Sequence, residues 1–150
     1  MRSGWASLLA AGIAVRPFPA AAQRVSEIGL HALLTTSSPV LWGGGVYGAV
    51  RPSARVRIAA TAAAGEAGGE VAGRGELVGH FLLNPTNRAG AGAYAGGGVA
   101  GVLGPNDQGY LVLLLGVEGS PGAGAGWALE LGVGAGLRIA AGYRWRRFPR

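Results

Sequence analysis

The sequence has no cysteine and no lysine, and it carries few charges of either sign. Without cysteine, disulfide scaffolds and thiolate-ligated zinc or iron–sulfur centres are excluded. All 13 basic residues are arginine, and charged residues make up only 13% of the chain. Glycine, by contrast, supplies 30 of 150 residues while hydrophobic residues reach 49%. This composition is too apolar for a disordered chain and unlike that of an average soluble domain.

Long apolar runs are also missing, because no stretch has the ~20 apolar residues that a membrane-spanning helix needs. The N-terminal segment instead resembles a secretory signal, with Arg2, an apolar stretch over residues 5–15 and an Ala-Ala-Ala site before Gln23. The sequence therefore predicts a cleaved signal peptide over residues 1–22 and one exported domain over residues 23–150. An uncleaved N-terminal anchor is the alternative.

Seven turn-forming clusters divide the exported part into about eight segments, each about 8–14 residues long. None of the segments has a sustained helical stripe, and a transmembrane strand needs ~9–11 residues. We therefore predict an all-β fold, a single antiparallel up-and-down β-barrel of about eight strands. The clusters are residues 36–39, 52–53, 65–69, 84–87, 104–108, 119–124 and 134–136.

Several segments alternate between an apolar face and a face of charged residues or glycine, as strands do. Segments 41–51 and 89–102 contain so much glycine that the sequence does not show which of their residues share a face. The alternation is clearest in residues 27–35, 55–61, 127–134 and 138–146, and less clean in residues 74–83.

Alternation alone does not say which face points inward, since a soluble barrel encloses apolar side chains and a membrane barrel encloses polar ones. The Arg-rich and Gly-rich polar face, the export signal and the aromatic residues near segment ends favour the membrane barrel. A soluble, lipocalin-like barrel that binds a small apolar ligand is the alternative. The aromatic residues are Trp42, Phe81, Tyr110, Trp127 and Trp145.

In a small membrane barrel the polar faces converge on a narrow interior that side chains fill. Opposite charges should pair there, so we expect a structural ion network that plugs the lumen, with glycines on facing strands making room for the arginines. A conducting path that favours anions is the other interpretation. The expected network comprises Glu27, His31, Arg55, Arg57, Arg74, Glu76, His80, Glu118, Glu130, Arg138, Arg144 and Arg146.

The two histidines raise the question of catalysis, because His beside Ser or Glu supports hydrolysis. The sequence has no G-x-S-x-G motif and no metal-binding histidine spacing. A lipid-modifying enzyme that uses His31, His80 and Glu76 is therefore the weakest alternative. We expect no catalytic residue, no cofactor and no metal.

The last segment, GYRWRRFPR, combines arginines with aromatic residues. Nucleic acid is not an expected partner for an exported chain, whereas Arg147 and Arg150 suit acidic lipid headgroups. At Gly142, Tyr143, Trp145 and Phe148 the segment resembles the final strand of the small eight-stranded outer-membrane β-barrel proteins of the OmpA/OmpX-like group.

This resemblance implies that the last strand is an insertion signal for the outer-membrane assembly machinery. It also implies a monomer in contact with membrane lipid, in the outer membrane of a Gram-negative-type bacterium, with both termini in the periplasm. The external turns would all be short, which argues against adhesion or receptor roles. We expect an outer-membrane barrel of structural or minor-transport type, and not an enzyme.

Overall fold

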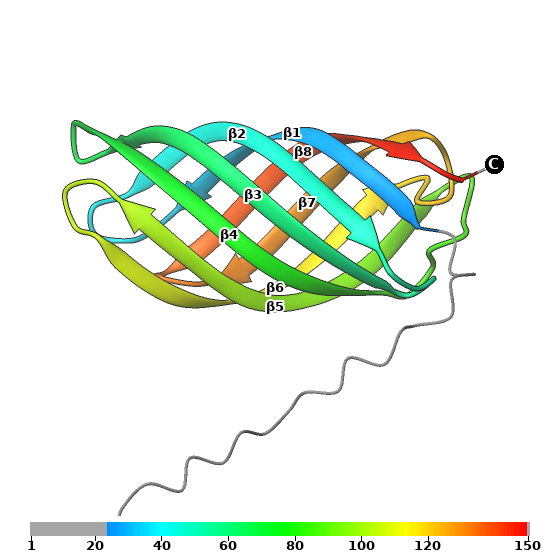
Figure 1. Ribbon diagram of the computed structural model, residues 1–150. Coiled ribbons are helices and arrows are strands. Elements are labelled where there is room, and N and C mark those ends of the chain that lie inside the picture. Colours follow the sequence, from blue (N-terminus) through cyan, green and yellow to red (C-terminus); the bar gives the residue numbers. More distant parts are fainter. Residues whose placement is uncertain (1–23, 150) are drawn as a thin grey trace, which may run out of the picture.

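The computed structural model describes residues 24–149 and places them in one closed barrel of eight antiparallel strands (Figure 1). Each strand pairs with its neighbours in chain order, and β8 closes the ring by pairing with β1. The predicted up-and-down barrel is confirmed, whereas the predicted signal over residues 1–22 lies outside the described residues. The strands are β1 (Val25–Thr35), β2 (Leu41–Arg51), β3 (Val56–Ala67), β4 (Glu70–Leu82), β5 (Ala91–Leu103), β6 (Gln108–Gly119), β7 (Ala125–Val133) and β8 (Leu137–Arg147).

The strands are long enough to cross a bilayer. They contain between 9 and 13 residues. An 11-residue strand such as β1 spans about 28 Å along the axis at a tilt of ~40° and ~3.3 Å per residue. The hydrocarbon core of a bilayer is ~30 Å thick. Residues 24–149 contain no helix long and apolar enough to cross a membrane.

The side chains on the outer face of the barrel are apolar. In β6, Leu111, Leu113 and Leu115 are 80%, 64% and 68% exposed, while the intervening Val112 and Leu114 are buried. The same alternation runs along β1, β7 and β8. Within the eight strands, exposed charged residues occur only at strand ends, at Glu66, Glu70 and Arg147.

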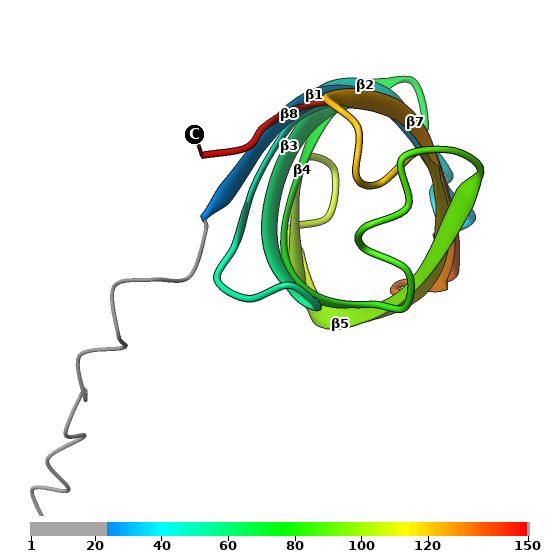
Figure 2. The same cartoon turned by 90° about the vertical axis from the view of Figure 1, so that its right-hand side faces the viewer.

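At the end that holds the termini, two connecting segments lie across the opening. The β4–β5 loop (residues 83–90) and the β6–β7 turn (residues 120–124) both fold over it (Figure 2). They are joined by backbone hydrogen bonds, in which Gly122 N–H donates to Asn87 O at 2.7 Å and Ser120 N–H donates to Gly90 O at 2.7 Å.

At the opposite end, buried apolar side chains rather than a loop occupy part of the interior. A buried cluster forms there where β1 and β3 end and where β2 and β4 begin. The cluster consists of Leu33, Leu41, Ala67, Ala72 and Ala140.

Candidate functional site

Within residues 24–149, ten charged side chains are buried inside the barrel, and none is more than 9% exposed. They come from every strand except β5. Six arginines and four glutamates leave a net formal charge of +2. Burying so many charges is costly unless each is paired and hydrogen-bonded. The ten are Arg51, Arg57, Arg74, Arg138, Arg144, Arg146, Glu27, Glu76, Glu118 and Glu130.

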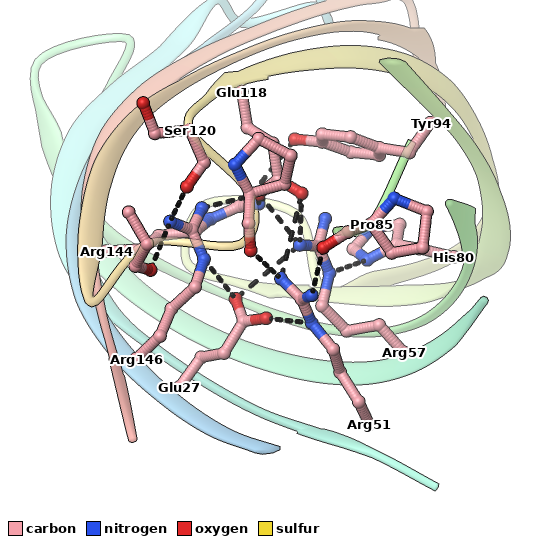
Figure 3. A network of polar contacts seen from close by, with 12 residues as sticks. Glu27, Arg51, Arg57, His80, Pro85, Tyr94, Glu118, Ser120, Arg144 and Arg146 are labelled. Atoms are coloured by element: carbon pink, nitrogen blue, oxygen red, sulfur yellow. Dashed lines mark hydrogen bonds and ion pairs between the residues drawn. The ribbon is translucent and has the colours of Figure 1, made fainter. Parts of the chain in front are cut away.

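Glu118 is the centre of the network in the half of the barrel nearer the termini (Figure 3). Its carboxylate lies 2.9 Å from Arg57 Nη1 and 2.8 Å from Arg146 Nη2. Arg144 Nη1 lies at 3.3 Å and Arg51 Nη2 at 3.8 Å. One carboxylate on β6 is therefore shared by guanidinium groups from β2, β3 and β8.

Arg51 connects this network to the loops that cover the opening. Its Nε donates to Glu27 Oε1 at 2.5 Å. Its two terminal nitrogens point to backbone carbonyls, with Nη1 at 3.5 Å from Pro85 O and Nη2 at 3.4 Å from Pro121 O. Arg146 Nη1 similarly donates to Ser120 O at 3.2 Å. The interior arginines thus hold both connecting segments in place.

The second half of the network is built around Glu76. Its carboxylate accepts hydrogen bonds from Arg138 Nη2 at 2.7 Å and from Arg74 Nε at 2.7 Å. Arg138 Nη1 also lies 2.9 Å from Glu130 Oε2. Glu130 Oε1 in turn accepts from Arg144 Nη2 at 2.6 Å. Because Arg144 also pairs with the first half, the ion pairs form one continuous chain along the barrel.

Two tyrosines contact the arginines in addition to the carboxylates. Tyr94 Oη donates to Glu130 at 2.8 Å and accepts from Arg144 Nη2 at 3.1 Å. The Arg57 guanidinium lies 4.5 Å from the centre of the Tyr94 ring, and that of Arg144 lies 4.2 Å from the Tyr47 ring. Such cation–π contacts strengthen when the groups are removed from water.

Glycines on the inner faces leave room for these large side chains. A Cβ on Gly29 would lie 3.3 Å from Cγ of Arg144, its cross-strand neighbour. A Cβ on Gly116 would overlap the Tyr94 ring. The cost of glycine within a strand is therefore offset by the space it gives to the network.

Eleven of the twelve residues predicted from the sequence face the interior. Arg55 does not face the interior, so its predicted place in the ion network was wrong. Pairing in β3 begins at Val56, so Arg55 belongs to the turn after β2 and is exposed. His31 is only half-buried, and its Nδ1 has no hydrogen-bond partner.

Three members of the site were missed, namely Arg51, Tyr47 and Tyr94. All three lie on the glycine-rich strands β2 and β5, whose phase the sequence left open. Tyr47 and Arg51 are an even number of residues apart, which in hindsight places them on one face of β2. Nothing near Tyr94 indicates that it points inward.

The two histidines lie among the arginines of the interior. His80 Nδ1 accepts a hydrogen bond from Arg57 Nε at 3.1 Å. His31 lines a cavity of about 20 Å³ together with Glu130, Arg138 and Arg144. That volume is enough for about one water molecule. Across residues 24–149, no three His, Asp or Glu side chains are grouped as a metal site.

The residues of the predicted insertion signal lie on and just after β8. Tyr143 and Trp145 point outward, are about half-exposed and pack edge to face at 5.3 Å between ring centres. Gly142 is on the inner face, where a Cβ would lie 2.6 Å from Leu30 O. Phe148 follows the strand and is 39% exposed. The two outward aromatics are thus placed at the surface of the barrel near its terminus-bearing end.

No protein-family model matches the chain, and no curated protein matches it. Solved structures that share its fold include two bacterial β-barrels. The N-terminal β-barrel domain of Pseudomonas aeruginosa OprF superimposes with a TM-score of 0.64 at 11% identity, over 81% of this chain and 97% of that domain. Neisserial surface protein A (NspA) gives 0.57 at 12% identity, over 81% of this chain and 96% of the other. The chain therefore has the fold of these barrels, as the resemblance of its last strand predicted.

Proposed function

We propose that the chain is an integral outer-membrane β-barrel of a Gram-negative-type bacterium, of structural or minor-transport type, with a lumen plugged by ion pairs. In this proposal residues 1–22 are the export signal and residues 23–150 the barrel. The inverted distribution of side chains is the observation that carries the proposal. Charged residues fill the interior while leucines, valines and aromatics cover the outside.

The apolar exterior supports contact with lipid rather than with water. Leu111, Leu115 and Val71 are between 68% and 86% exposed, and they belong to an apolar band that continues around the strands. Soluble monomers rarely expose contiguous apolar patches larger than a few hundred Å². In a bilayer the same surface is favourable, and the closed ring leaves no strand edge unpaired.

The filled interior supports a scaffold rather than an open pore. The ion pairs run along the barrel, two loops cover one end, and an apolar cluster lies at the other. Eight strands enclose just enough space for side chains. The turns opposite the termini are short, with the longest gap between strands spanning residues 36–40, which supports a structural role over a receptor or an adhesin.

The interior also argues against a soluble barrel that binds an apolar ligand. Ligand sites have volumes of about 300–1,000 Å³ and are mostly apolar. The cavity beside His31 has about 20 Å³ and is lined by Glu130 and two arginines. A lipid-modifying enzyme is also disfavoured, because His80 is buried inside the barrel and faces away from the lipid-exposed surface.

Assembly of the barrel is the last element of the proposal. We propose that Gly142, Tyr143, Trp145 and Phe148 are read by the outer-membrane assembly machinery and that the barrel is a monomer. The outward position of Tyr143 and Trp145 supports this role, because both side chains remain accessible on the terminal strand.

Two measurements on the membrane fraction test this function. The protein should resist extraction by an alkaline wash, and its gel mobility in detergent should shift when the sample is boiled. A soluble barrel used as a control should be released by the wash. Release of this protein at alkaline pH, together with unchanged mobility on heating, would overturn the proposal.

A further inference from the structure

The exposed charges of the barrel are divided by sign between its two ends. Within residues 24–149, every exposed arginine lies at the end that holds the termini, namely Arg24, Arg55, Arg88 and Arg147. Every exposed carboxylate in the same range lies at the opposite end. These are Glu66 and Glu70 at the β3–β4 turn and Asp107 between β5 and β6.

Two of these arginines border a groove beside the ends of β1 and β8. Arg24 and Arg147 line it together with Ser26, Phe148, Pro149 and Arg146, whose side chain is buried in the interior network. Ser26 is the cross-strand partner of Arg147, so the groove follows the seam that closes the barrel. Its lining combines cationic groups, a hydroxyl and an aromatic ring.

Two tryptophans lie on the outer face of the barrel near the same end as these arginines. Trp127 and Trp145 are 44% and 45% exposed, each near the terminus-bearing end of its strand. Such residues settle at the level of the lipid headgroups. The arginines beyond them are then placed at the height of the phosphates.

We infer that the groove between Arg24 and Arg147 binds the phosphate of an anionic membrane phospholipid, and that the surrounding arginines make this end of the barrel prefer anionic lipid. The inference rests on the proposed membrane-embedded function. No exposed carboxylate of residues 24–149 lies at this end to compete for the arginines. Each arginine near an anionic surface contributes roughly a fivefold preference.

Tryptophan quenching by brominated lipids tests the inference separately at each end. Trp42 lies near the opposite end, at the start of β2 and 56% exposed. A Trp5→Phe, Trp42→Phe variant therefore reports the arginine-bearing end, and a Trp5→Phe, Trp127→Phe, Trp145→Phe variant reports the opposite end. Each is reconstituted in mixed vesicles in which either phosphatidylglycerol or phosphatidylcholine carries the bromine.

At the arginine-bearing end, brominated phosphatidylglycerol should quench several-fold more effectively than brominated phosphatidylcholine. Arg24→Gln with Arg147→Gln should abolish most of this preference, whereas Glu66→Gln at the opposite end should leave it unchanged. Trp42 should show no preference for phosphatidylglycerol. Equal quenching by both lipids at the arginine-bearing end, or a preference that survives loss of both arginines, would overturn the inference. Absence of quenching by either lipid would instead overturn the proposed membrane function.

Discussion

Glu118→Gln is the substitution that most severely tests the ion network. Glu118 is 1% exposed and lies within 4 Å of four arginines. Glutamine keeps the shape of the side chain but removes its charge, so the net interior charge rises from +2 to +3. Removing one partner of a buried ion pair costs about 3–5 kcal/mol, because it leaves charge uncompensated. We expect the free energy of unfolding to fall by about 3 kcal/mol.

Urea unfolding of the barrel in vesicles, followed by tryptophan fluorescence, measures this loss. The matched control is Glu66→Gln at an exposed strand end, which should change stability by less than about 0.5 kcal/mol. Adding Arg57→Met to Glu118→Gln should cost at least ~1 kcal/mol less than the sum of the two single changes, because the pair is in direct contact. A loss below about 1 kcal/mol for Glu118→Gln, or strict additivity, would refute the reasoning.

Three further substitutions probe packing, hydrogen bonding and the covering loops. Gly98→Ala should destabilise the barrel by about 1–3 kcal/mol in the same urea assay, because the added Cβ would lie 2.7 Å from Val78 Cα. Gly101→Ala is the control and should be tolerated, because a Cβ there would have nothing within 4 Å. Tyr94→Phe should cost about 1–2 kcal/mol by removing the hydroxyl between Glu130 and Arg144, and an unchanged unfolding midpoint would contradict that contact. Arg51→Ala should release residues 120–124, so their backbone amides should exchange with deuterium faster than in the unchanged protein, while those of central β6 stay protected. If the amides of this turn exchange at the same rate in both proteins, Arg51 does not hold the turn.

The turns and the division into strands could be predicted from the turn-forming clusters, and the faces of β1, β7 and β8 from side chains that alternate with a period of two. In β2 and β5 the many glycines leave no clear alternation of apolar and polar side chains. The inward positions of Arg51 and Tyr94 were therefore not predicted. Arg55 shared the period of its strand but lay before the first paired residue.

The pairing of particular charges could not be read from the sequence at all. Arg138 meets Glu76 across the barrel, 62 positions apart in the chain, because ring closure brings β8 opposite β4. The β4–β5 loop over the opening likewise contacts Arg51, which lies two strands away. Both features arise from tertiary closure rather than from local pattern.

The central claim is that the outer face of this barrel contacts lipid, and spin labelling tests it most directly. Because the chain has no cysteine, single labels at Leu113→Cys and Leu131→Cys report two outward positions in the middle of the barrel, and Ser53→Cys reports an exposed turn. In vesicles, the labels at 113 and 131 should be accessible to oxygen and shielded from a water-soluble nickel complex, with the reverse at 53. Equal accessibility of all three labels to the nickel complex would contradict the account.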